Sequence, residues 1–178
     1  TIGSMVLLGR RDRAHEILDY FFRDQRPVGW RHWAEVVRAD PREPWFIGDM
    51  PHTWVGSDFI NSMVLMLAYT RDRDAALILG AGLPREWLES EDGVLVDGLR
   101  TDFGPLTYSA RKVGERVRIE VGALPSTPPG GIWFSLPDVA SIRAVRIGSN
   151  QLSTTSDGLA QLPTLPAVLE VEYAEGQP

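Results

Sequence analysis

The spacing of apolar residues changes once along this chain, near residue 74, and this change limits the fold more than any other feature. Before it, apolar side chains recur every three to four residues, which is the period of a helix with one buried face. After it, apolar and polar residues alternate, as in a strand with one face in water. We therefore predict an α+β fold, with residues 1–74 helical and residues 75–178 forming an antiparallel β-sandwich.

Two main helices are expected in the first part. One covers residues 12–24, where apolar side chains share one face, and the other covers residues 53–70, whose apolar band is wide enough to be buried on most sides. Residues 71–74 follow as a charged turn, and residues 33–37 are expected to form a short helical turn. Residues 1–8 are typical of the last turns of a helix that began earlier, so we expect the chain to belong to a longer protein.

The second part contains six or seven short strand candidates separated by turn residues, a pattern that favours a sandwich. Gly114-Glu115 is a plausible two-residue hairpin turn, and residues 84–88 are expected to form a single helical turn. The predicted strands lie at residues 76–79, 94–99, 106–113, 116–121, 132–136, 142–147 and 168–173.

Composition excludes several classes of function. The net charge is −6 and Lys112 is the only lysine, which disfavours nucleic-acid binding because phosphates are bound by clustered basic residues. The chain contains no cysteine, and His15, His32 and His52 have spacings that fit no metal-ligand pattern. No stretch approaches the ~20 apolar residues that cross a membrane. We therefore expect no metal, no cofactor, no nucleic-acid partner and no membrane partner.

The segment between the two predicted helices is the best candidate for a functional site. Residues 25–53 form a long loop without a clear period, and long loops often have a function. The run of residues 44–59, which leads from this loop into the second helix, combines two tryptophans, two aspartates and a histidine. Tryptophan rings stack on sugar rings, and carboxylates accept hydrogen bonds from sugar hydroxyls. His52, Ser57 and Asp58 have the residue types of a serine-hydrolase triad, but the Gly-x-Ser-x-Gly motif is absent and we do not favour that hypothesis.

This arrangement resembles the end of an (α/α)6 barrel, as found in the six-hairpin glycosidase superfamily of glucoamylases, trehalases and glycoside phosphorylases. The resemblance rests on the Trp-bearing loop, the run Gly48-Asp49-Met50-Pro51-His52-Thr53-Trp54, the helix opening Trp54-Val55-Gly56-Ser57, and the turn Leu83-Pro84-Arg85-Glu86-Trp87 before a β-domain. It implies that the chain is the C-terminal part of a glycoside hydrolase acting on an oligo- or polysaccharide.

The resemblance also assigns roles to individual residues. Asp49 occupies the position of the general base, although many relatives use Glu there. Trp45, Trp54 and Trp33 would contact sugar rings, and His52 would bond sugar hydroxyls. Asp58, which we expect in the first turn of the last helix, is a further contact candidate. The general acid of an inverting mechanism would come from an earlier hairpin, so this chain alone is expected to be inactive.

Two alternatives remain open. In the first, the chain is a non-catalytic carbohydrate-binding or structural β-module that stabilises a helical partner. In the second, it is a barrel relative that has lost activity and only recognises carbohydrate. The expected partners are therefore a carbohydrate and either the missing N-terminal part of the barrel or a second copy, bound through exposed helices.

Overall fold

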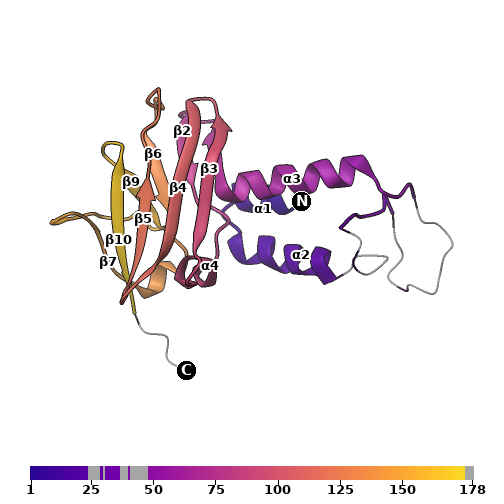
Figure 1. The fold of residues 1–178 in the computed structure, drawn as a ribbon, viewed down its shortest axis with the longest axis horizontal. Coiled ribbons are helices and arrows are strands. Elements are labelled where there is room, and N and C mark those ends of the chain that lie inside the picture. The colour runs from indigo at the N-terminus through magenta and orange to yellow at the C-terminus, as the bar shows by residue number, and fades with distance from the viewer. Residues whose placement is uncertain (24–28, 30, 37–39, 41–47, 175–178) are drawn as a thin grey trace. The chain divides into compact units, whose positions relative to one another are not determined.

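The computed structural model describes residues 1–23, 29, 31–36, 40 and 48–174. The chain divides into two compact units, residues 1–65 and residues 66–178. Helices come first and β-sheets follow, as the colour gradient of Figure 1 shows, so the predicted α+β class is confirmed.

The first unit is built from three helices, α1 (Ile2–Leu7), α2 (Arg11–Arg23) and most of α3 (Thr53–Leu67). The backbone N–H of Gly3 donates a hydrogen bond to Ser62 Oγ at 3.1 Å, which joins α1 to α3. Ala14 and Leu18 form the buried face of α2. The predicted helix over residues 12–24 is therefore present, beginning one residue earlier.

Helix α3 differs from the sequence prediction in its burial. We expected it to be buried on most sides, yet within this chain Trp54 is 78% exposed and Ile60 is 63% exposed. Ser62 and Met66 are its buried positions. Single exposed apolar side chains are common on protein surfaces, whereas a group of them often marks a surface that contacts another molecule. The wide apolar band of α3 is thus only partly covered by the described residues.

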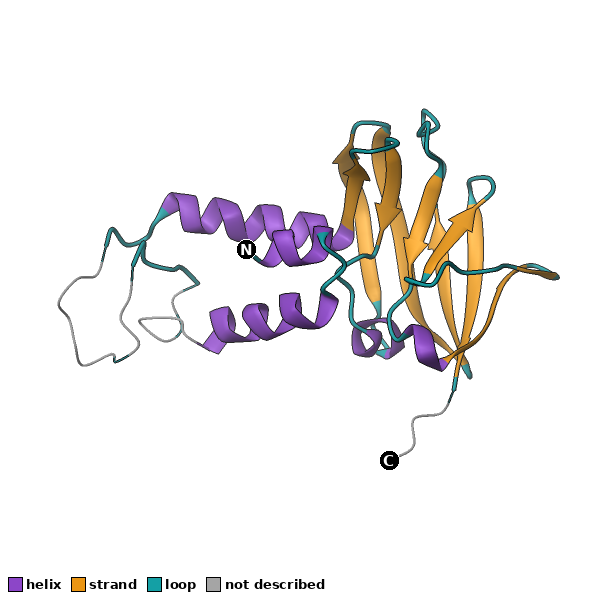
Figure 2. Cartoon of the chain, turned by 180° about the vertical axis from the view of Figure 1, so that it is seen from behind, coloured by secondary structure: helices purple, strands orange, loops and turns teal. Residues whose placement is uncertain are grey.

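The second unit contains two sheets (orange in Figure 2). The four-stranded sheet has the order β1-β2-β6-β9 and the six-stranded sheet the order β3-β4-β5-β10-β7-β8. All neighbouring strands are antiparallel except β2 and β6, which run parallel. The strands are β1 (Ala68–Arg71), β2 (Ala76–Leu79), β3 (Val94–Thr101), β4 (Gly104–Val113), β5 (Arg116–Val121), β6 (Ile132–Ser135), β7 (Ile142–Ile147), β8 (Asn150–Gln151), β9 (Leu159–Leu162) and β10 (Ala167–Tyr173).

One hydrophobic core lies between the two sheets, which confirms the sandwich. Apolar side chains from both sheets belong to this core, including Leu77 and Phe134 from one sheet and Ile119 and Leu169 from the other. The ring of Tyr108 on β4 meets Phe134 on β6 edge to face, with centroids 5.8 Å apart, and so links the sheets. Two short helices, α4 (Arg85–Glu89) and the 3₁₀ turn η1 (Val139–Ser141), complete the unit.

The buried hydroxyl of Tyr108 also holds the chain just before β1. It donates a hydrogen bond to the Leu67 carbonyl oxygen at 2.9 Å. Burial raises the pKa of Tyr108, because the phenolate would lose its hydration, so the hydroxyl stays protonated and remains a donor.

The region around residue 70 corrects the sequence prediction. Helix α3 ends at Leu67 and not near residue 70, and residues 68–71 form strand β1, which pairs with residues 76–79. The charged residues still form the connecting turn, where Arg71 bonds the Asp74 carboxylate at 2.7–2.9 Å.

Strands β8 and β9 were not predicted. The helical turn at residues 84–88 and the Gly114-Glu115 hairpin turn are confirmed by α4 and by the β4–β5 pair.

Candidate functional site

The base of the long loop is closed by hydrogen bonds between its two arms. The amide of Glu35 donates to the Asp49 carbonyl oxygen at 3.2 Å, and the amide of His52 donates to the Trp33 carbonyl oxygen at 3.0 Å. A third bond runs from Gly48 N to the Val36 carbonyl oxygen at 3.3 Å. These bonds hold residues 33–36 in a non-helical conformation, so the predicted helical turn at residues 33–37 is wrong for the part that the structure describes.

Gly48 makes this close approach possible. A Cβ atom at residue 48 would lie 2.6 Å from Glu35 Cβ and 3.2 Å from the Val36 nitrogen. Both distances are shorter than ordinary van der Waals contact, so the arms would have to separate around any larger residue. The sequence Gly48-Asp49 thus places the aspartate next to the point where the two arms are tied.

Trp33 anchors the same segment to the helices. Its ring lies 5.7 Å from Phe21 of α2 and 4.6 Å from Phe59 of α3, measured between centroids. Its indole Nε1 donates a hydrogen bond to the Phe21 carbonyl oxygen at 3.0 Å. This half-buried tryptophan therefore fixes the loop against α2 and α3, and its polar atom is already engaged.

Asp49 itself presents an exposed side chain from a fixed backbone. Among the residues that the structure describes, none hydrogen-bonds or pairs with its carboxylate. The carboxylate is therefore exposed to water as far as the described residues are concerned. A general base needs this access, because it must reach the water molecule that it activates.

His52 and Trp54 lie at the junction of the loop and α3. Their ring centroids are 6.1 Å apart, and the Trp54 ring extends into solvent. The Nδ1 atom of His52 is buried without a hydrogen-bond partner among the described residues, although the ring as a whole is only half-buried. The site therefore offers one aromatic face and one imidazole close to Asp49 in sequence.

The remaining candidates are placed less favourably. Asp58 is exposed on α3, but the helix begins at Thr53, so Asp58 is not in the first turn and the helix-dipole argument does not apply to it. Trp45 lies outside the described residues. No group of three or more His, Asp or Glu side chains within the described part of the chain is arranged to hold a metal ion.

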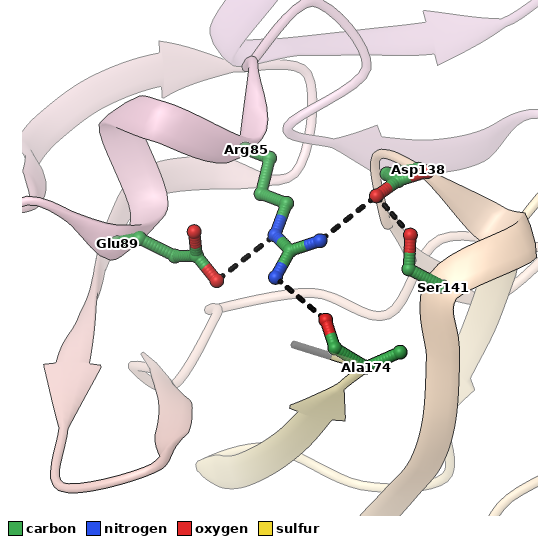
Figure 3. Close-up of polar contacts among 5 residues, drawn as sticks. All are labelled: Arg85, Glu89, Asp138, Ser141 and Ala174. Atoms are coloured by element: carbon green, nitrogen blue, oxygen red, sulfur yellow. Dashed lines mark hydrogen bonds and ion pairs between the residues drawn. The ribbon is translucent and has the colours of Figure 1, made fainter. Parts of the chain in front are cut away.

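A polar network that sequence reasoning missed lies in the β unit, around Arg85 (Figure 3). Its guanidinium donates to Glu89 Oε1 at 2.9 Å, to Asp138 Oδ2 at 2.9 Å and to the Ala174 carbonyl oxygen at 3.2 Å. Ser141 Oγ donates to the same Asp138 carboxylate. The network joins α4, η1 and the residue after β10.

The pKa values of Arg85 and Asp138 are each shifted in the direction that favours the charged form. Burial alone would lower the pKa of Arg85, but its hydrogen bonds with Glu89 and Asp138 outweigh burial and raise it. The hydrogen bond from Ser141, followed by that from Arg85, lowers the pKa of Asp138. Only the Arg85–Glu89 pair has a sequence signal, the four-residue spacing of a helix. We interpret the network as structural, because the hydrogen bonds of the Arg85 guanidinium all go to groups of the same unit.

Comparisons with known proteins add no relatives to this picture: no family model, no curated protein and no solved structure matches the chain. None of the helices in the described ranges is long and apolar enough to span a membrane.

Proposed function

We propose that this chain forms part of the sugar site of a carbohydrate-active enzyme, a glycoside hydrolase, with Asp49 as the general base. The observation that supports this most directly is the exposed carboxylate of Asp49, which pairs with none of the described residues and stands on a backbone fixed by the Glu35 bond. Positioned groups on otherwise variable loops are the usual form of a catalytic residue.

The neighbouring side chains fit the same proposal. The exposed Trp54 ring has the area and flatness to stack on a sugar ring. The Nδ1 atom of His52, which has no hydrogen-bond partner among the described residues, can bond a hydroxyl group after a small movement. Asp49 would take the proton from water as the water attacks the anomeric carbon. A second carboxylic acid, ~6.5–9.5 Å away in an inverting site, would protonate the leaving oxygen. We assign that acid to residues outside this chain.

The test is a turnover measurement on the natural protein that contains this chain. Release of reducing ends from a panel of neutral oligosaccharides is measured for wild type and for Asp49→Asn. We expect kcat to fall by about two to four orders of magnitude, the usual contribution of acid–base catalysis. Asp19→Asn, an exposed carboxylate of α2 in the same unit, is the matched control and should keep its rate. Unchanged turnover in Asp49→Asn would refute the assignment.

A second candidate function is favoured by the apolar surface of the helical unit. Leu8, Tyr20, Phe22 and Ile60 are each more than half exposed in this chain, and isolated units rarely leave so many large apolar side chains in water. In this alternative the chain is a non-catalytic module that stabilises a helical partner or a second copy of itself. Analytical ultracentrifugation separates the two: a dimer that persists on dilution, and is lost in Ile60→Lys, supports the module.

A further inference from the structure

The β unit contains a cleft of about 330 Å³ that is far in sequence from Asp49. Its walls come from Leu124, from residues 126–127 and from residues 161–165, and Gly131 and Ile132 complete the lining. Sites for small ligands have volumes of ~300–1,000 Å³, so this cleft is at the lower end of the range. It is large enough to accept a small ligand or one end of a longer one.

The chemistry of the lining selects an uncharged ligand. Thr127, Thr164 and Gln161 provide hydroxyl and amide groups, and Leu124 and Leu165 provide apolar contacts. No charged side chain is found among the residues that the structure describes around this cleft. A phosphate or carboxylate ligand would therefore lose its hydration without gaining a cation in return. A ligand with hydroxyl groups and apolar CH faces would satisfy both kinds of wall.

Gln161 is the largest polar side chain in the lining of this cleft. It is exposed on the edge strand β9 and pairs in register with Trp133 of β6, so the two side chains share the outer face of the sheet. Its amide has two donor hydrogens and an acceptor oxygen, a combination that matches two adjacent hydroxyl groups. The Trp133 indole is oriented by its own hydrogen bond to the Gly130 carbonyl oxygen at 2.9 Å.

Gly131 keeps that amide accessible. A Cβ atom at this position would lie 3.1 Å from Gln161 Nε2 and 3.7 Å from Trp133 Nε1. The backbone there has a φ of +76°, which L-residues rarely adopt. A side chain at residue 131 would therefore both strain the turn and crowd the amide. The glycine leaves the space between the cleft and the tryptophan open.

From these features we infer that the cleft binds a neutral saccharide through Gln161, Thr127 and Thr164. This inference does not rest on Asp49 or on hydrolysis, and it gives the β unit a ligand of its own. In a carbohydrate-active enzyme such a site would hold part of a polysaccharide away from the reacting bond.

The experiment is an NMR titration of the full chain with maltohexaose and, separately, with cellohexaose. We expect saturable shifts at the Gly131 amide, the Gln161 side-chain amide and the Trp133 indole N–H with at least one of the two sugars. The loss of one hydrogen-bonding group costs about 1 kcal/mol, so Gln161→Leu should weaken binding roughly five- to tenfold. Gln151→Leu, an exposed glutamine on β8 of the other sheet, is the matched control and should bind as wild type.

Three outcomes would overturn the inference. The first is the absence of saturable shifts at these groups with both sugars. The second is equal affinity of Gln161→Leu and Gln151→Leu for the sugar. The third is binding of hexagalacturonate as strong as that of the neutral sugar, because the cleft should reject its carboxylates. The Asp49→Asn variant should retain the shifts in the cleft. The turnover assay therefore tests the role of Asp49, and the NMR titration tests sugar binding by the cleft independently of it.

Discussion

Replacing Arg85 by methionine should weaken the β unit more than replacing any exposed arginine on its surface. Methionine keeps most of the apolar stem but removes the guanidinium, whose carbon also lies 4.5 Å from the Tyr173 ring centroid. The change leaves Asp138 and Glu89 without their shared cation and the Ala174 carbonyl oxygen without this donor. The interactions lost are therefore three hydrogen bonds and one cation–π contact.

The expected magnitude follows from how exposed these groups are. The Arg85 side chain is only 20% exposed, but its carboxylate partners are 31% and 42% exposed, so solvent weakens both ion pairs. We take ~0.5–1 kcal/mol for each pair, at the upper end of surface salt bridges. The cation–π contact adds about 0.5–1 kcal/mol, and the carbonyl hydrogen bond adds about 0.5–1 kcal/mol. The sum is roughly 2–4 kcal/mol of unfolding free energy.

Urea denaturation followed by circular dichroism measures this loss. The midpoint should fall by about 1–2 M for an m-value near 2 kcal/mol/M. Arg143→Met, at an exposed position of β7, is the control and should stay within about 0.5 kcal/mol of wild type. If Arg85→Met is as stable as Arg143→Met, the network does not stabilise the fold and our reasoning is wrong.

The pH dependence provides a second check on the same network. The pKa of Asp138 lies below its ordinary value of 3.8 in the folded chain, so its stabilising contribution is complete above that pH. The contribution is lost as the pH falls through the lowered folded value. The difference in stability between wild type and Arg85→Met should therefore narrow below pH 3.8 and stay constant between pH 5 and 8. A gap that widens in acid would contradict the assignment.

The other predictions concern the loop base and the sandwich core. Gly48→Ala should separate the two arms, seen as faster hydrogen exchange at the Glu35 amide, because its Cβ would lie 2.6 Å from Glu35 Cβ. Trp33→Phe should lower the unfolding free energy by about 1–2 kcal/mol in thermal melts, through the lost indole hydrogen bond. Tyr108→Phe should cost about 1–3 kcal/mol, because the Leu67 carbonyl loses its donor. The Tyr108 contribution should persist up to pH 10.0 and decline above it, since the pKa of Tyr108 is raised in the folded chain.

Several parts of the candidate site required the tertiary structure. The sequence indicated a long tryptophan-bearing loop and selected Asp49, but not that Glu35 and Asp49 are joined through their backbones. A hydrogen bond between the backbones of two distant residues does not depend on their side chains, so the residue types do not reveal it. Trp33 shows the same limit, since its type suits a sugar contact as well as the aromatic packing that it makes with Phe59. The Arg85–Asp138 pair joins residues 53 positions apart, and no pattern in the sequence indicated it.

What the sequence determined by itself was the class of each segment. The alternation of Val117, Ile119 and Val121 was sufficient for strand β5, because period two places all three side chains on the buried face. Only the tertiary structure decided that residues 68–71 leave the helix and become strand β1. The apolar pattern there suits either element, and pairing with residues 76–79 selects the strand. Local periodicity records which face is buried, whereas strand pairing and the orientation of polar side chains depend on partners far along the chain.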